Sequence, residues 1–349
     1  MPYYGRLFDR AYEGFMYMWS ELLITLVLIL ISAQLFSNAL EYFGERINIS
    51  TGVTGSIFAA ISTALPETTV PLLALIAGTS NRQVNEEISV GAILGAPLML
   101  STLSTFIMAC SVIKKRGING YIAPEITGFQ RDLNFFLVAF TLAALAMFLP
   151  LKPNYLRILF SVLLITLYFI YLVLTFNASK ALVENGHAVI TNEPLFLARL
   201  GLKTNLKTIL IQLMFALILL VCSAKGFIQG VQGVAEALGV PVLLLSLLII
   251  PIATELPEKV NSVIWVRKNQ DTLGFGNITG AMVFQGTLLP ALGILLTPWR
   301  PSRIVLTGIL VTYLATAWLR FSISTHGIKI STLFLNGILY VAYLVIVLS

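Results

Sequence analysis

The sequence predicts an all-α polytopic membrane protein with ten transmembrane helices, arranged as two inverted-topology repeats of five. Three observations predict this fold class. Of the 349 residues, 57% are hydrophobic and only 11% are charged, whereas soluble domains have roughly 25% charged residues. The chain contains ten apolar runs near the roughly 20 residues that a helix needs to span a bilayer. A short motif also recurs in the two halves.

The ten predicted helices use nearly the whole length of the chain and leave no room for a soluble domain. They cover residues 17–38, 50–78, 88–112, 133–150, 155–176, 205–224, 239–266, 273–297, 302–320 and 328–348. The first contains "SELLITLVLILISAQLF", which is long enough to cross and is not followed by a clear small-residue cleavage site. We therefore expect a retained helix and not a signal peptide.

Two motifs repeat in the same order. The second predicted helix carries "STALPETTV" at 62–70, and the seventh carries "ATELPEKVN" at 253–261, with the same threonine, leucine, proline and glutamate in matching places. The third and eighth carry "GAILGAPLML" at 91–100 and "GNITGAMVFQ" at 276–285. Five helices separate the copies, and an odd number inserts the halves in opposite orientations. Inverted repeats of this kind are typical of secondary transporters.

The repeat sets the predicted domain boundaries. Residues 1–176 form the first five-helix repeat, residues 177–204 form a polar connecting loop, and residues 205–349 form the second repeat. Basic residues are richer in the links 3–4, 5–6, 7–8 and 9–10, for example at Lys114 and Arg267. The positive-inside bias places these links in the cytoplasm and both termini outside a cell membrane. Because the basic residues are spread over helix ends, we expect no nucleic-acid partner.

The proline–glutamate motifs predict an oxygen-rich pocket. Pro66 and Pro257 lack an N–H and clash with the carbonyl four residues earlier, which frees backbone oxygens. Such groups are tolerated at membrane depth only where they are buried in protein or face a cavity. The Gly91/Gly95 and Gly276/Gly280 pairs of the second motif predict close helix packing beside this pocket.

Acidic side chains join these carbonyls. Thr63 and Glu67 are four residues apart, as are Thr254 and Glu258, so each pair shares one face of its helix, and Glu255 adds a third carboxylate. Carboxylate, carbonyl and hydroxyl oxygens bind hard cations such as Ca²⁺. Cysteine and histidine are missing from these motifs, which disfavours zinc and copper. Without a cation, we expect some of the acids to bind protons.

A structural interpretation stays open beside the functional one. The glutamates could cap broken helices or pair with basic residues such as Lys259. An ionised glutamate at the centre of a membrane helix costs roughly 2.5 kcal/mol or more, so such acids usually mark ion paths. The recurrence of Glu67 and Glu258 favours function, whereas Glu255 and Lys259 have no counterpart in the first repeat.

At these residues the sequence resembles the calcium/cation antiporter superfamily, whose sodium/calcium exchanger members carry two inverted repeats with a motif close to G-T-S-x-P-E. The resemblance implies that Glu67 and Glu258 coordinate the transported ions. It also implies further oxygen ligands in both halves: the side chains of Thr63 and Thr254 and the carbonyls of Ala60 and Pro251.

The chain departs from the pattern of that superfamily at several ligand positions. Ala64 and Glu255 stand where the family usually has serine. In the second motif, Leu100 and Gln285 replace an asparagine or aspartate, although Gln285 still offers a carbonyl oxygen. Fewer oxygens leave proton exchange open beside sodium exchange.

The sequence thus predicts a secondary active cation antiporter without a resident cofactor. Ca²⁺ is the favoured cargo, exchanged for Na⁺ or H⁺ by alternating access, with predicted helices 1 and 6 moving as the gate. The predicted ligands are Glu67, Glu258, Thr63, Thr254, Glu255 and Gln285. The alternatives are a cation/proton exchanger for another cation and an ion-binding channel or sensor. An enzyme is not expected, because no histidine or nucleophile motif accompanies the acids.

Overall fold

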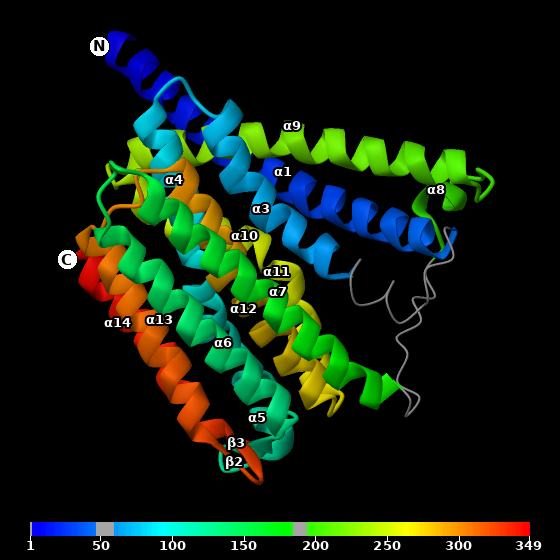
Figure 1. The fold of residues 1–349 in the computed structure, drawn as a ribbon. Coiled ribbons are helices and arrows are strands. Elements are labelled where there is room, and N and C mark those ends of the chain that lie inside the picture. The colour runs from blue at the N-terminus through cyan, green and yellow to red at the C-terminus, as the bar shows by residue number, and fades with distance from the viewer. Residues whose placement is uncertain (1, 47–58, 184–193) are drawn as a thin grey trace. The chain divides into compact units, whose positions relative to one another are not determined.

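A computed structural model describes residues 2–46, 59–183 and 194–349 of the chain (Figure 1). The described residues are almost entirely helical and form two compact units. The first unit combines Met1–Ile88 with Ala181–Ile249, and the second combines Ser89–Lys180 with Ile250–Ser349. Each unit therefore contains segments from both halves of the sequence.

Eight helical segments of the described chain are long and apolar enough to cross a bilayer. They are Met18–Leu40, Arg82–Arg116, Ile126–Phe148, Tyr155–Asn177, Leu206–Leu238, Asp271–Leu296, Arg303–Ser322 and Ile330–Leu348. Two shorter apolar helices, Glu67–Ala77 and Val242–Ile252, lie in the predicted spans 50–78 and 239–266. Residues 50–58 of the former lie outside the described part. The predicted count of ten is therefore not confirmed. The two predicted spans that are in doubt, 50–78 and 239–266, are those that carry the proline–glutamate motif.

The first unit is built around two long helices that lie side by side (Figure 1). Its elements are α1 (Pro2–Arg46), α3 (Ala59–Ala77), α8 (Phe196–Arg199), α9 (Leu206–Leu238) and the first part of α10 (Val242–Thr254). A Cβ atom at Gly230 of α9 would lie 3.1 Å from the Cα of Leu22, and one at Gly226 would lie 2.7 Å from the Cγ2 of Thr25. Small residues thus let α1 and α9 approach closely, as is common between membrane helices.

The second unit is a helical bundle with a three-stranded antiparallel sheet at one end, in the order β1-β3-β2. Tyr121 of β1 pairs with Lys329 of β3, and Ile323 of β2 pairs with Ile328. Its elements are α4 (Arg82–Met99), the π-helix η2 (Leu100–Ser104), α5 (Thr105–Arg116), β1 (Tyr121–Ile122), α6 (Ile126–Leu145), the 3-10 helix η3 (Ala146–Phe148), α7 (Tyr155–Val183), α11 (Leu256–Arg267), α12 (Asp271–Leu296), α13 (Arg303–Ser322), β2 (Ile323–Ser324), β3 (Gly327–Lys329) and α14 (Ile330–Leu348).

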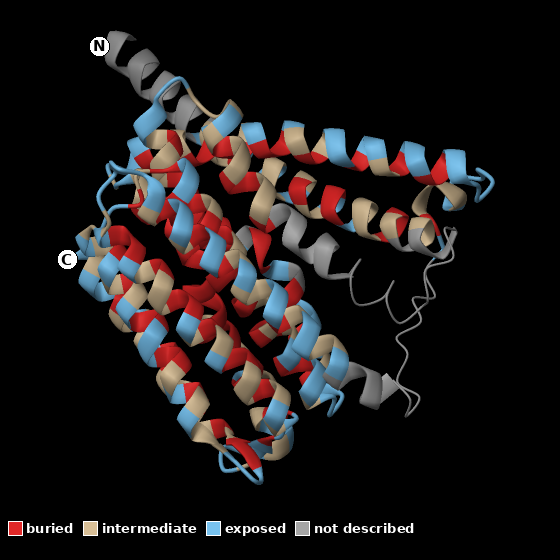
Figure 2. Cartoon of the chain, in the orientation of Figure 1, coloured by how far each residue is buried: buried red, intermediate tan, exposed pale blue. Residues whose placement is uncertain are grey.

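Helix α12 packs against α6 and α11 and is buried over much of its length (Figure 2). Its close contacts are made by glycines that the sequence analysis did not single out. A Cβ at Gly286 would lie 2.7 Å from the Cδ2 of Phe136, whereas one at Gly276 would meet no atom within 4 Å. The close packing predicted at Gly276 is therefore wrong, because open space surrounds that position.

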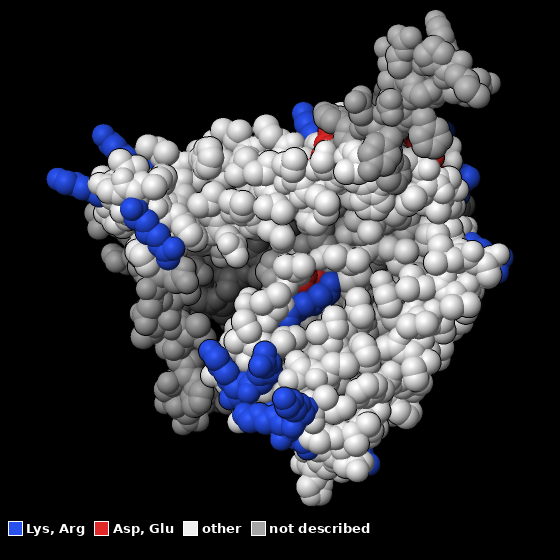
Figure 3. All heavy atoms as spheres, turned by 180° about the vertical axis from the view of Figure 1, so that it is seen from behind, with Lys and Arg blue, Asp and Glu red and all other residues white. Residues whose placement is uncertain are grey.

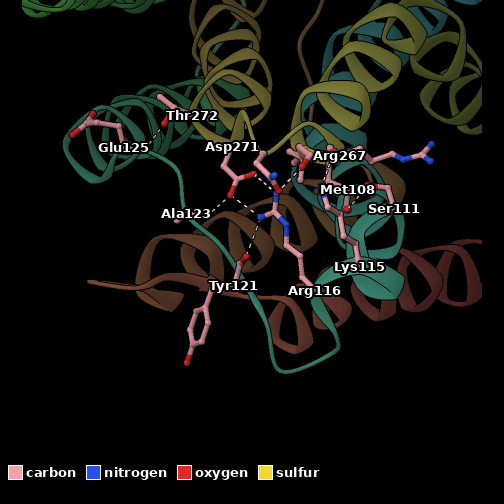
Figure 4. Close-up of polar contacts among 12 residues, drawn as sticks. Met108, Ser111, Lys115, Arg116, Tyr121, Ala123, Glu125, Arg267, Asp271 and Thr272 are labelled. Carbon is pink, nitrogen blue, oxygen red and sulfur yellow. Dashed lines mark hydrogen bonds and ion pairs between the residues drawn. The ribbon is translucent and has the colours of Figure 1, made fainter.

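An ion-pair network joins the end of α5 to the turn between α11 and α12 (Figure 4). Arg116 makes a two-pronged contact with Asp271, with both N–O distances 2.7 Å, and also donates to the carbonyl of Val266 at 2.6 Å. Asp271 accepts a further bond from the Ala123 N–H at 2.8 Å. Both charged side chains are largely buried. The network fixes α5, α12 and the segment before α6 to one another.

Glu125 begins α6 as its N-cap, accepting bonds from the N–H groups of Thr127 at 2.7 Å and Gly128 at 2.5 Å. Partial burial alone would raise the pKa of Glu125, but these hydrogen bonds outweigh it and the pKa is lowered. A lowered pKa means that the cap stabilises the folded state above about pH 4 and loses that contribution as the pH falls through the folded-state value.

Replacing Glu125 with alanine should therefore lower the free energy of unfolding by about 1 kcal/mol at pH 7. Thermal unfolding in detergent at pH 7 and pH 3 measures the difference, which should shrink at pH 3. Glu125→Gln is the matched control, since it keeps an acceptor without a titrating charge. An equal loss for Glu125→Ala at both pH values contradicts the prediction.

Candidate cation site

The second proline–glutamate motif interrupts its helix. Glu255 lies between α10 and α11 with φ −90° and ψ 1°. Its N–H donates to the carbonyl of Pro251 at 3.1 Å, and its own carbonyl accepts from the N–H of Lys259 at 3.1 Å. Pro257, in the first turn of α11, has no N–H to offer the Ala253 carbonyl four residues earlier. The sequence thus produces a break with a carboxylate at its centre.

Four predicted ligands of the second repeat gather around this break. Glu255 and Glu258 are buried, with exposed fractions of 0% and 2%. The side-chain amide of Gln285, from α12, donates to one carboxylate oxygen of Glu255 at 2.9 Å. The Oγ1 of Thr254 lies 3.4 Å from the other oxygen and donates to the carbonyl of Ile250 at 3.2 Å. An amide and a hydroxyl therefore contact the Glu255 carboxylate, and an oxygen of the buried Glu258 carboxylate lies within 4.8 Å of a Glu255 oxygen.

The carboxylate oxygen Oε2 of Glu258 is buried and accepts no hydrogen bond from the residues that the structure describes. The backbone around it is anchored, because the side-chain amide of Asn277 donates to the carbonyl of Glu258 at 3.1 Å and to the Oγ of Ser262 at 3.1 Å. A buried polar atom without a partner is rare and calls for an explanation such as an ion. This oxygen fits a site that a cation or a proton completes.

The first-repeat residues lie on α3, in the first unit. Glu67 occupies the middle of this helix. Thr63 and Ala60 belong to its backbone, but their side chains lie outside the described part of the chain. Within the second unit, the structure brings together four of the predicted ligands: Thr254, Glu255, Glu258 and Gln285.

A further buried acid escaped the sequence analysis. Asp132 of α6 is 5% exposed and accepts a hydrogen bond from the Oγ1 of Thr279 at 2.7 Å. Arg131 lies 3.4 Å from its other oxygen, with its guanidinium 5.9 Å from the ring of Tyr171. The predicted helix began at residue 133 and left Asp132 in a loop, whereas α6 begins at Ile126. An acid-base pair beside an apolar run was the available signal.

Asp132→Ala should lower the free energy of unfolding by about 3 kcal/mol, because it leaves the Arg131 guanidinium without its acidic partner and removes one of the two acceptors of the Thr279 hydroxyl. Thr279→Val should cost roughly 0.6 kcal/mol, the average for one hydrogen bond between membrane helices. Thermal unfolding in detergent measures both. Thr307→Val is the control, since Thr307 is bonded only on the exposed side of α13. Unchanged unfolding of Asp132→Ala would refute the proposed anchoring of α6 to α12.

The sequence around the broken helix belongs to a longer match with a family model. Residues 18–177 and 208–349 match the model of the sodium/calcium exchanger protein family. The chain belongs to the sodium/calcium exchanger family. The resemblance read from the proline–glutamate motifs is thereby confirmed, and the protein is a multi-pass membrane protein of a cation exchanger family.

Other proteins are similar to this chain in sequence or in fold. CaxA of Alkalimonas amylolytica is 26% identical over 279 residues, which are 79% of this chain and 80% of that protein. The structure of the H⁺/Ca²⁺ exchanger CAX is similar with a TM-score of 0.72 at 19% identity, covering 94% of this chain and 82% of that one. The sodium-calcium exchanger NCX_Mj gives a TM-score of 0.55 at 20% identity, with 95% and 99% covered. These structures share the fold of this chain.

Proposed function

We propose that the protein is a secondary active antiporter that exchanges a cation, with Ca²⁺ as the favoured cargo, for H⁺ or Na⁺ by alternating access. The observation that carries the proposal is the buried Glu258 carboxylate at the α10–α11 break, with Oε2 unpaired among the described residues. An acid at membrane depth is costly and usually marks an ion path. Hard oxygen donors around it are those that Ca²⁺ prefers.

The proposed ligand set draws on both repeats. Glu258, Glu255, Thr254 and Gln285 come from the second repeat, where their mutual contacts support the assignment. Glu67 and Thr63 come from the first, where the repeated motif supports it. No resident cofactor is proposed, since the cations are cargo.

Alternating access would couple binding to motion. A cargo cation or counter-ions would neutralise the carboxylates. Exposing the neutral site first to one side of the membrane and then to the other would cost less free energy than exposing the charged site. We assign the moving part to α1 and α9, which are predicted helices 1 and 6. Their close, glycine-lined packing against each other and their shared membership of the first unit support this assignment.

The proposal includes two inverted-topology repeats and an orientation of the chain in the membrane. The last turns of α5 and α11 hold Lys114, Lys115, Arg116 and Arg267, and Lys115 donates to the carbonyl of Arg267 at 3.4 Å. Figure 3 shows Lys and Arg side chains gathered in the lower part of the visible surface. By the positive-inside bias this end is cytoplasmic, which leaves both termini extracellular.

The deciding test is ⁴⁵Ca²⁺ uptake into proteoliposomes holding the purified protein, driven in parallel by an outward Na⁺ gradient and an outward H⁺ gradient. Uptake that saturates and requires one of these gradients is expected, with Glu67→Gln as the inactive control. Flux without any counter-ion gradient would favour a channel, and Ca²⁺ binding without flux would favour a sensor. Uptake under neither gradient would remove Ca²⁺ as the cargo.

A further inference from the structure

Lys259 places a positive charge beside the break between α10 and α11. It lies one helical turn after Glu255 and two turns after Pro251, so the three share one face of the broken helix. Its side chain runs back past the break, where its ammonium donates to the carbonyl of Pro251 at 3.2 Å. The same ammonium contacts the sulfur of Met99, at the end of α4. Lys259 is partly buried, and its ammonium lies at the carbonyl of Pro251, two helical turns before its own position.

The carbonyl of Pro251 is therefore saturated. It accepts the N–H of Glu255 at 3.1 Å as well as the ammonium of Lys259, and a carbonyl oxygen has two lone pairs. Backbone carbonyls at a broken membrane helix, beside carboxylates, are ligands that alkali cations use. A lysine ammonium is a compact monovalent cation with three donors. It occupies the place at this oxygen that a free monovalent ion needs.

The charges of the acidic side chains and of Lys259 also favour a divalent cation without a bound monovalent ion. Within the second unit, two buried carboxylates, Glu255 and Glu258, accompany one ammonium. Adding Glu67, as the proposed function does, leaves a net charge of about minus two when all three acids are ionised. One divalent cation neutralises that charge without a monovalent companion.

We propose that Lys259 is a tethered monovalent cation that excludes Na⁺ from the exchanger's site. The inference rests on the proposed function in one respect, namely that Glu255 and Glu258 bind the cargo. If Lys259 prevents Na⁺ from binding, Na⁺ is not one of the ions that the protein exchanges. A lysine that only supports packing would affect stability but would not hide a Na⁺ site.

The test measures Na⁺ binding by thermal unfolding of the purified protein in detergent. NaCl is titrated against choline chloride at constant ionic strength for the parent, Lys259→Met, Lys259→Gln and Lys259→Arg. Lys114→Met, which removes an exposed lysine at the end of α5, is the matched control. The parent, the arginine variant and the control should show no Na⁺-specific effect. The methionine and glutamine variants should gain a saturable rise in Tm of about 5 °C at Na⁺ concentrations 100-fold above Kd.

A saturable, Na⁺-specific rise in the parent overturns the inference, and so does its absence in both neutral variants when they are folded. If neither neutral variant folds, the parent alone decides: Na⁺-driven ⁴⁵Ca²⁺ uptake by the parent overturns the inference, and a parent that neither binds nor uses Na⁺ supports it. A parallel CaCl₂ titration of the parent separates the two proposals. A parent that ignores Ca²⁺ while Lys259→Met gains Na⁺ binding sinks the Ca²⁺ assignment and leaves the role of Lys259 standing.

Discussion

Glu258→Gln is expected to abolish cation exchange, lowering the initial rate of uptake by roughly 100-fold or more, which corresponds to about 2.7 kcal/mol. Glutamine keeps the shape of the side chain and one carbonyl oxygen but removes the charge that a buried cation needs. The buried carboxylate has an oxygen without a partner among the described residues, so neutralising it should not disrupt a structural bond. The folded state should therefore persist while transport is lost.

The measurement is ⁴⁵Ca²⁺ uptake into proteoliposomes, with size-exclusion profiles to establish that the variant is folded. The repeated motif predicts the same result for Glu67→Gln. Glu236→Gln is the matched control, since Glu236 lies on the exposed face of α9 and bonds only to Gln232. Exchange retained in both Glu258→Gln and Glu67→Gln would rule out the carboxylate site.

Asp271→Ala should cause a large loss of stability, about 3 kcal/mol. It leaves the Arg116 guanidinium without its two-pronged partner and removes the acceptor of the Ala123 N–H (Figure 4). Charge-assisted, two-pronged pairs are roughly twice as strong as neutral hydrogen bonds. A fall in Tm of roughly 6 °C or more follows, measured by thermal unfolding in detergent.

An exposed ion pair of similar bond length supplies the control for Asp271. Arg82 and Glu86 are joined at 2.8 Å on one helix, with Arg82 almost fully exposed. Exposed pairs of this kind contribute about 0.3–0.5 kcal/mol, so Glu86→Ala should barely change the Tm. If Asp271→Ala and Glu86→Ala lower the Tm equally, the Arg116 network does not hold this end of the second unit together.

Hydropathy predicted the bounds of a helix well where nearly all its residues are apolar. It predicted them poorly where polar residues are buried inside the helical bundle. The predicted helix at 155–176 agrees closely with Tyr155–Asn177, because nearly every residue there is apolar. The start of α6 was placed seven residues late, because Arg131 and Asp132 satisfy each other inside the bundle. The span 239–266 proved to be two helices, because Pro257 and Glu255 interrupt it.

The motif repeat predicted residues that the structure places close together, but not how they are connected. Thr254, Glu255, Glu258 and Gln285 were all in the predicted set, and the structure places them around the α10–α11 break; their role as ligands stays a prediction. The direction of Lys259 could not be predicted. A broken helix brings the Pro251 carbonyl within reach of its ammonium, and sequence spacing alone does not give that geometry.

The π-helix η2 changes which side chains of the span Arg82–Arg116 lie on the same helical face. A π-turn adds one residue to a helical turn, so the residues after it are rotated by about 100° from the phase that α4 sets. The buried positions of α5, Thr105, Met108, Ala109 and Val112, are therefore in register with η2 and not with α4. Deleting one residue between Leu100 and Ser104 would turn these side chains away from their present neighbours by about 100°, whereas the composition and hydropathy of the span would hardly change. The span thus contains two successive helices out of phase, and its packing depends on the length of the chain as much as on the identity of its residues.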